Sequence, residues 1–287
     1  MSVRWPSLWN GGEMTSIYTL DNSFARGHFT VTVVGCGGTG GFVAESLSRL
    51  LPEQADLVLV DHDRVEERNL TRQNFYREDL GRFKSETLAH RLAQKFDRPV
   101  GYSTLPVAMT QLSFPGLVIG CVDNGLARRD IARAVKRIIH ERSWWIDAGN
   151  GENYGQVVIG NTDVASYCLP IGDIYCGLPL PTIQKPELLN QAPKARGCAE
   201  VAEEQGPTIN LTMAAVVVEV VRRLIAGTCP WVQLYIDMET GTLVPVLATP
   251  ETVKALNKRK GGKPWESFTA SCATRSYQRI TLAGGMP

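Results

Sequence analysis

The sequence predicts an α/β fold, in which a mostly parallel, Rossmann-like sheet is flanked by helices. An apolar β-branched run, Val31–Val34, leads directly into a glycine-rich loop, Gly35–Gly41. A second apolar run, Leu57–Val60, ends in Asp61. Strand, glycine turn, helix, strand and acid in this order are typical of a nucleotide-binding βαβ unit.

The rest of the chain continues this alternation of short apolar runs with segments of helical spacing. The expected strands are 31–34, 57–60, 101–105, 117–121, 144–146, 155–159, 232–237 and 242–246. The expected helices are 41–51, 84–96, 125–142 and 209–225. Strands that alternate with helices indicate a parallel sheet, and the last two strands form a hairpin that adds an antiparallel C-terminal extension.

Changes in pattern along the chain divide it into five regions. A proline-rich stretch with three cysteines and no sustained periodicity is expected to be a long crossover loop, because loops of this length are usually functional or disordered. The regions are an N-terminal arm (1–29), a nucleotide-binding core (30–166), the crossover loop (167–207), the remainder of that domain (208–250) and a C-terminal tail (251–287).

The composition excludes several classes of protein. Of the 287 residues, 44% are apolar, and the net charge of +1 offers no basis for binding nucleic acid or an anionic membrane. No apolar run approaches the ~18–20 residues of a membrane-spanning helix, and no signal-peptide core is present at the N-terminus. We therefore expect a cytoplasmic protein with reduced thiols. The basic residues of the run 258–263 are expected to be exposed to solvent.

The glycine loop fits the dinucleotide pattern G-x-G-x-x-G at Gly35, Gly37 and Gly40, with Gly38 as an additional glycine. Glycines let the backbone approach a phosphate closely, and the following helix N-terminus attracts its charge. Asp61 lies where an acid would bind the ribose hydroxyls. By itself this pattern also fits a NAD-linked oxidoreductase.

The stretch after Asp61 favours a triphosphate instead. Arginine and lysine suit phosphate oxygens, and asparagine and glutamine add neutral donors. The residues concerned are Asn69, Arg72, Gln73 and Lys84. A hydride-transfer enzyme has no use for these extra cations, whereas an enzyme that handles a triphosphate does.

Asp123 closes a buried strand at the expected carboxyl edge of the sheet, where ligands of open α/β sheets bind. A carboxylate there can hold Mg²⁺ against a triphosphate. The alternative is that Asp123 caps the helix that begins at Gly125.

The cysteines suggest one candidate nucleophile. Cys198 lies beside Arg196 in the irregular segment, so its thiol could have a lowered pKa; the alternative is an incidental cysteine. Cys168 and Cys176 are too far apart in sequence for the usual zinc-binding pair, so no structural zinc is expected.

Taken together, these motifs form an ordered set. The set is Gly35, Gly37, Gly38, Gly40, Asp61, Asp63, Asn69, Arg72, Gln73, Lys84, Asp123 and Asn124. It resembles the ThiF/MoeB family, the prokaryotic relatives of ubiquitin-activating enzymes, over roughly residues 30–247. The segment Ile236–Gly241 followed by Pro245, together with the short N-terminal arm, looks closest to the ThiF-like members called PRTRC-system proteins.

The resemblance implies an ATP-binding adenylation core. Such enzymes use ATP and Mg²⁺ to adenylate the C-terminal glycine of a small ubiquitin-like or sulfur-carrier protein, releasing pyrophosphate. By position, Asp61 with Asp63 would bind the ribose side, and Asp123 with Asn124 the Mg²⁺ and α-phosphate. The phosphates would be held by Asn69, Arg72, Gln73 and Lys84.

The resemblance also implies partners. Family members are often homodimers, and many carry a cysteine just before the long helix. Here that residue is Cys198, which could take over the activated carboxyl as a thioester, or take part in sulfur transfer, before a conjugating-enzyme-like acceptor.

Two features depart from the family pattern. The two C-x-x-C zinc pairs of many members are missing, and the N-terminal arginines, Arg4 and Arg26, do not lie at the offset of the arginine that reaches the γ-phosphate. Adenylation of another carboxylate, such as a peptide or a modified tRNA base, and a non-catalytic binding scaffold remain alternatives. The full polar set argues against the scaffold.

Overall fold

An eight-stranded sheet, in the order β11-β10-β7-β6-β5-β2-β3-β4, forms the centre of the molecule. The computed structural model describes residues 17–113, 115–136, 143–190 and 207–257. The strands are β2 (Phe29–Val34), β3 (Ala55–Val60), β4 (Val100–Ser103), β5 (Gly116–Gly120), β6 (Trp144–Asn150), β7 (Tyr154–Gly160), β10 (Trp231–Asp237) and β11 (Thr242–Leu247). The strands from β4 to β6 are parallel, and β7, β10 and β11 extend the sheet antiparallel. The expected fold class is therefore confirmed.

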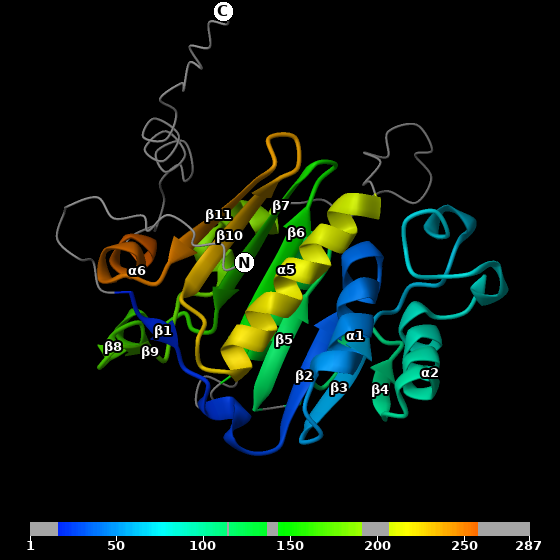
Figure 1. Cartoon of the computed structure of the whole chain (residues 1–287), viewed down its shortest axis with the longest axis horizontal. Coiled ribbons are helices and arrows are strands. Elements are labelled where there is room, and N and C mark those ends of the chain that lie inside the picture. Colours follow the sequence, from blue (N-terminus) through cyan, green and yellow to red (C-terminus); the bar gives the residue numbers. More distant parts are fainter. Residues whose placement is uncertain (1–16, 114, 137–142, 191–206, 258–287) are drawn as a thin grey trace, which may run out of the picture.

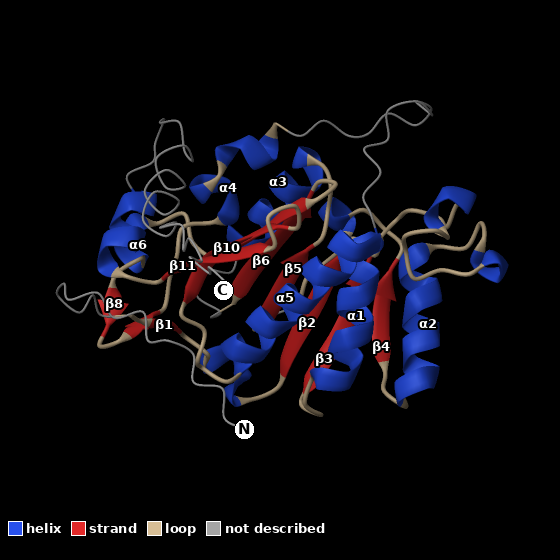
Figure 2. Ribbon diagram, turned by 45° about the horizontal axis from the view of Figure 1, so that its top comes forward, coloured by secondary structure: helices blue, strands red, loops and turns tan. Residues whose placement is uncertain are grey.

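Helices cover both faces of this sheet (Figures 1 and 2). The helices are α1 (Gly38–Leu50), α2 (Lys84–Phe96), α3 (Gly125–Lys136), α4 (Pro181–Gln184), α5 (Pro207–Ile225) and α6 (Pro250–Asn257). Short 3₁₀ turns are η1 (Ser23–Arg26), η2 (Glu67–Asn69), η3 (Arg77–Asp79), η4 (Val107–Met109), η5 (Ala165–Tyr167) and η6 (Pro186–Leu189). In the described ranges no helix combines the length and the apolar character needed to cross a membrane.

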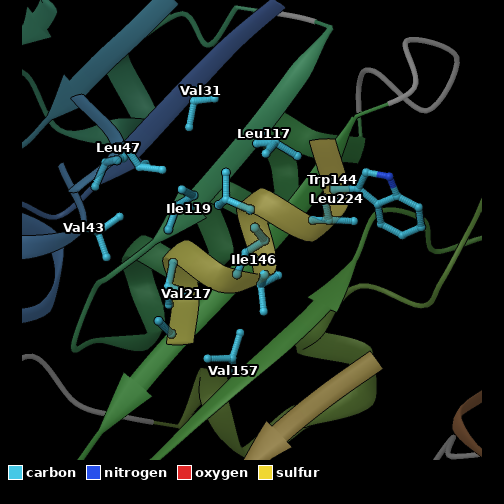
Figure 3. Packing of buried hydrophobic residues seen from close by; sticks show 14 of the residues in the cluster. Val31, Val43, Leu47, Leu117, Ile119, Trp144, Ile146, Val157, Val217 and Leu224 are labelled. Atoms are coloured by element: carbon cyan, nitrogen blue, oxygen red, sulfur yellow. The ribbon is translucent and has the colours of Figure 1, made fainter. Parts of the chain in front are cut away.

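The core has two layers because strand side chains alternate between the faces. Val31 and Ile119 pack with Val217 of α5 on one face, as Figure 3 shows. On the other face Val118 packs with Ile131 of α3. Trp144 and Trp145 are consecutive and both fully buried, and they point to opposite faces, so the strand is covered on both sides.

The chain reverses its direction of travel across the sheet between β2 and β5. From β2 it moves outward through β3 to β4, and it then returns to add β5 on the other side of β2. In open α/β sheets this reversal leaves a crevice at the carboxyl ends of the two strands, where ligands bind. The glycine loop follows β2 and Asp123 follows β5, so both lie at this point.

Three regions differ from the sequence expectation. The tail that was expected from residue 251 contains most of α6, whose Val253 and Leu256 are buried in the main core. The described part of the N-terminal arm is built into the fold: β1 (Thr19–Leu20) pairs with β9, and Leu20 and Phe24 are buried in the main core. The described part of the crossover loop is also structured, because β8 (Pro170–Ile171) and β9 (Ile174–Tyr175) complete a three-stranded sheet with β1. Strands β1 and β9 lie more than 150 residues apart in the sequence, so no local sequence pattern predicts their pairing.

Candidate nucleotide-binding site

Two glycines of the loop are required by close packing. Gly35 has φ +90°, and a Cβ there would lie 2.5 Å from the carbonyl oxygen of Cys121. A Cβ at Gly40 would lie 1.8 Å from the carbonyl oxygen of Gly35, so only glycine lets α1 pack this closely on the loop. At Gly37, by contrast, the nearest described atom would be 3.7 Å away, on Gln73. The loop is therefore less crowded at Gly37 than at Gly35 or Gly40, with room there for at least a Cβ atom.

Asp61 is held against this loop by two backbone N–H groups. Its Oδ2 accepts a hydrogen bond of 2.6 Å from Cys36, and its Oδ1 accepts one of 2.8 Å from Asp63. Burial raises the pKa of Asp61, and Lys84 together with the two backbone donors counteracts that rise. Each carboxylate oxygen has a second lone pair, so the acid can still accept from hydroxyl groups of a ribose.

The Asn69–Gln73 turn borders the other side of the loop. Asn69 is buried, and its Oδ1 accepts the Glu66 backbone N–H at 2.9 Å, so this oxygen has a structural role. The backbone N–H groups of Arg72 and Gln73 both donate to the Asn69 carbonyl. Gln73 Oε1 is buried and has no hydrogen-bond partner within the described ranges. A buried acceptor without a partner fits a site that a donor-bearing ligand completes.

Lys84 begins α2 and is only 7% exposed. Its Nζ lies 3.4 Å from Asp63 Oδ2, and its backbone N–H donates to the Asp63 carbonyl. A buried ammonium needs a nearby anion. The structure brings Lys84 together with Asp61 and Asp63. Of the two cations among the predicted phosphate ligands, Arg72 and Lys84, Lys84 is the more deeply buried.

The sequence left open whether Asp123 binds Mg²⁺ or caps α3, and the structure assigns the cap to its neighbour Asn124. Asn124 Oδ1 accepts the Ala127 backbone N–H at 2.9 Å, so Asn124 is the N-cap of α3. Asn124 Nδ2 also donates to Asp123 Oδ1 at 3.4 Å. The Asp123 side chain is exposed at the carboxyl end of β5. Because the cap is a different residue, Asp123 is left as an accessible carboxylate suited to a divalent cation.

Sequence reasoning missed a buried ion pair between α3 and β6. Arg128 on α3 and Asp147 on β6 are both almost completely buried, and Arg128 Nε donates to both carboxylate oxygens at 3.0 and 3.1 Å. Arg128 falls on the helical face of Ile131 and Val135. A charged residue on an apolar face was the signal that could have predicted a buried partner.

Sequence reasoning also missed the side chain of Asn210. It begins the buried face of α5 and lies against Gly38, where a Cβ would come within 2.4 Å of Asn210 Nδ2. Asn210 of α5 therefore packs directly against Gly38, whereas the atom nearest to a Cβ at Gly37 would be 3.7 Å away, on Gln73.

The predicted nucleophile, Cys198, and the N-terminal Arg4 lie outside the described residues. Arg26 is exposed in η1, just before β2. At ~3.3 Å per residue the six residues of β2 place it about 20 Å from the loop at the other end of the strand. Arg26 therefore does not reach the site of its own chain.

Burial keeps most of the described cysteines protonated. It raises the pKa of Cys121 to about 12, and those of Cys168 and Cys229 to about 11. The pKa of Cys36 is also raised, mainly by burial. Thiols with such values are poor nucleophiles at neutral pH.

Comparison with known proteins gives consistent matches. The sequence profile of the ThiF family matches residues 25–227. Ubiquitin-like modifier-activating enzyme 5 of Arabidopsis thaliana is 29% identical over 155 residues, and that of Xenopus laevis is 32% identical over 143 residues. The matched regions are 47% and 44% of this chain but 35% and 34% of the relatives, so the match spans about a third of their length.

Solved structures share the fold. The crystal structure of E. coli MccB has a TM-score of 0.57 at 16% identity, covering 84% of this chain and 68% of that one. The structure of PaaA has a TM-score of 0.56 at 15% identity, covering 78% and 73%.

Proposed function

The chain belongs to the ThiF family, and from this premise we propose that it catalyses the ATP-dependent adenylation of a carboxylate. The observation that carries the proposal is the buried Lys84 beside Asp61, next to a glycine loop with room at Gly37. A dinucleotide oxidoreductase has no need for a buried cation at this position, whereas a triphosphate does.

In the proposed reaction a carboxylate oxygen attacks the α-phosphorus of ATP. A carboxyl oxygen–phosphorus bond forms, the bond from phosphorus to the bridging oxygen of pyrophosphate breaks, and pyrophosphate leaves with the electron pair. Asp61 holds the ribose hydroxyls. The phosphate oxygens accept hydrogen bonds from Asn69, Arg72, Gln73 and Lys84. These residues act mainly by position and charge.

Asp123 would hold Mg²⁺, with Asp63 and Asn124 nearby in the set that borders the nucleotide. When bound, the ion would neutralise developing negative charge on the phosphates. The exposed Asp123 carboxylate fits this role because Asn124, not Asp123, caps α3.

We propose further that the substrate is the C-terminal glycine of a small ubiquitin-like or sulfur-carrier protein. The matches to ubiquitin-like modifier-activating enzymes support this. We also propose that the protein is a cytoplasmic homodimer. The activated carboxyl group would then be transferred to Cys198. Another carboxylate is the second candidate, because MccB shares this fold and has been solved with ATP and in complex with N-formylated MccA.

ATP–pyrophosphate exchange tests the activity. Exchange that requires a small protein ending in glycine supports the full proposal, and exchange with a different carboxylate supports only its chemistry. Absence of exchange with every candidate carboxylate would refute it and favour a binding scaffold.

Two pairs of variants make the test specific to the site. Asp123→Ala should lower exchange by about 10²-fold or more while ATP still binds, as expected for loss of charge stabilisation. Asp56→Ala is the control, because Asp56 is an exposed acid on β3 that pairs with His28. Lys84→Met should weaken ATP binding, and Lys95→Met, at the far end of α2, should not.

A further inference from the structure

Three polar side chains meet beside the glycine loop, on the side away from Asp61. They are Thr39 in the first turn of α1, Asn150 at the end of β6 and Asn210 in the first turn of α5. We call them the carboxamide cluster. Thr39 and Asn210 are buried, Asn210 to 1% exposure. None of the three has a role in the nucleotide site described above.

Hydrogen bonds determine how Asn210 is oriented. Its Oδ1 lies 3.2 Å from the donor Asn150 Nδ2 and 3.3 Å from Thr39 Oγ1. Thr39 Oγ1 also lies 3.2 Å from Asn150 Oδ1, so its single proton is shared between these two acceptors. Asn150 Nδ2 also donates to the Gly151 carbonyl at 3.3 Å, which fixes the orientation of Asn150. Exchanging the oxygen and nitrogen of Asn210 would then place two N–H donors against each other. Asn210 Nδ2 must therefore point away from the cluster.

That nitrogen is left without an acceptor. Asn210 Nδ2 is buried against Gly38 and has no hydrogen-bond partner among residues that the structure describes. Buried donors are nearly always paired, and an unpaired one is unfavourable. A more apolar side chain would avoid this penalty. The donor is therefore best explained by an acceptor that arrives with a ligand.

The position of the cluster indicates which ligand group that is. Along the carboxyl edge of the sheet, β3 ends at Asp61, β2 at the glycine loop, β5 near Asp123 and β6 at Asn150. Lys84 and the Asn69–Gln73 turn lie on the β3 side. They would hold the departing pyrophosphate on that side. In phosphoryl transfer the attacking and leaving oxygens lie roughly in line on opposite sides of phosphorus. The attacking carboxylate must then enter from the β6 side.

We propose that Asn210 is a substrate-binding residue, whose Nδ2 donates to an oxygen atom of the carboxyl-terminal residue of the acyl substrate. This inference rests on the proposed adenylation. Thr39 and Asn150 are positioning residues, because they hold the Asn210 carboxamide in the orientation that presents its N–H groups.

The test uses Asn210→Asp and Asn210→Ala in the full chain. Aspartate has nearly the same shape but replaces the donor by an acceptor. ATP–pyrophosphate exchange would be measured with the Gly-ending substrate that supports exchange by the unmodified chain. We expect the KM for that substrate to rise at least about tenfold in both variants, and more in Asn210→Asp, while the Kd for ATP changes less than about twofold. Thr212→Ala, on the same helix, is the control and should leave both values unchanged.

The outcomes separate this inference from the proposed function. No exchange by the unmodified chain with any carboxylate refutes both. Exchange with an unchanged KM for the acyl substrate in the variants refutes only the role of Asn210. A parallel loss of ATP affinity also refutes it, because the cluster would then merely support the glycine loop. Thermal unfolding identifies a variant that fails to fold. In that case Asn150→Asp, which disturbs the orientation of Asn210 without removing its donor, must raise the same KM or the inference falls.

Discussion

Removing Asp147 should destabilise the protein more than any exposed charge change on α3. Asp147→Asn removes the buried carboxylate charge that pairs with Arg128, whose side chain is only 1% exposed. Breaking a buried ion pair from one side costs about 3–5 kcal/mol, and a typical domain has only about 5–15 kcal/mol in total. At roughly 2–4 °C per kcal/mol for a large domain, the melting temperature should fall by about 6–20 °C.

Denaturant unfolding followed by circular dichroism measures this free energy, and two comparisons interpret it. Asp130→Asn removes the exposed partner of Arg133 on the same helix, and should change stability by less than about 1 kcal/mol. Replacing the pair together, with Arg128→Met and Asp147→Leu, should restore most of the loss, because no buried charge then lacks a partner.

The consequence for the site follows from the position of Arg128. It lies one turn after Asn124, which caps α3 beside Asp123, so the ion pair anchors this end of the helix to β6. A loss below about 1 kcal/mol in Asp147→Asn would refute the assignment of the pair as an anchor. So would a double variant that is as unstable as the single variants combined.

The remaining predictions concern the glycine loop, the ribose acid and the acyl acceptor. Gly40→Ala should destabilise the fold by about 1–3 kcal/mol or more, since its Cβ would lie 1.8 Å from the Gly35 carbonyl, whereas Gly37→Ala should chiefly weaken nucleotide binding; equal unfolding midpoints for the two would contradict this. Because burial raises the pKa of Asp61, that acid takes up its proton at a higher pH than an ordinary aspartate. Nucleotide affinity should therefore fall as pH drops through a midpoint above the pKa of an ordinary aspartate. A calorimetric titration showing no such midpoint, or the same one in Asp61→Asn, would argue against the ribose role. Cys198→Ala should spare exchange and abolish a thiol-reducible conjugate, and a conjugate that persists on a non-reducing gel would discard Cys198 as acceptor.

Much of the fold was predictable because its signals are local. The helix from Lys84 to Phe96 was predicted with the bounds that the structure shows, since apolar spacing and its polar start fall within one segment. Cys36 of the glycine loop and Asp61 lie 25 residues apart within one βαβ unit. The N-terminal arm was harder, because Leu20 and Phe24 become core residues only through distant partners.

By itself, the sequence determined the α/β class, the glycine loop and the polar set that we propose borders a nucleotide, because each depends on the order and spacing of neighbouring residues. Only the tertiary structure decided that Asn124 rather than Asp123 caps α3, since either side chain satisfies the capping pattern. It alone joined Thr39 to Asn210 across 171 residues and left Asn210 Nδ2 without a partner in the part of the chain that the structure describes. Such contacts depend on strand order and on which helix faces cover the sheet, and no periodicity within a segment encodes them.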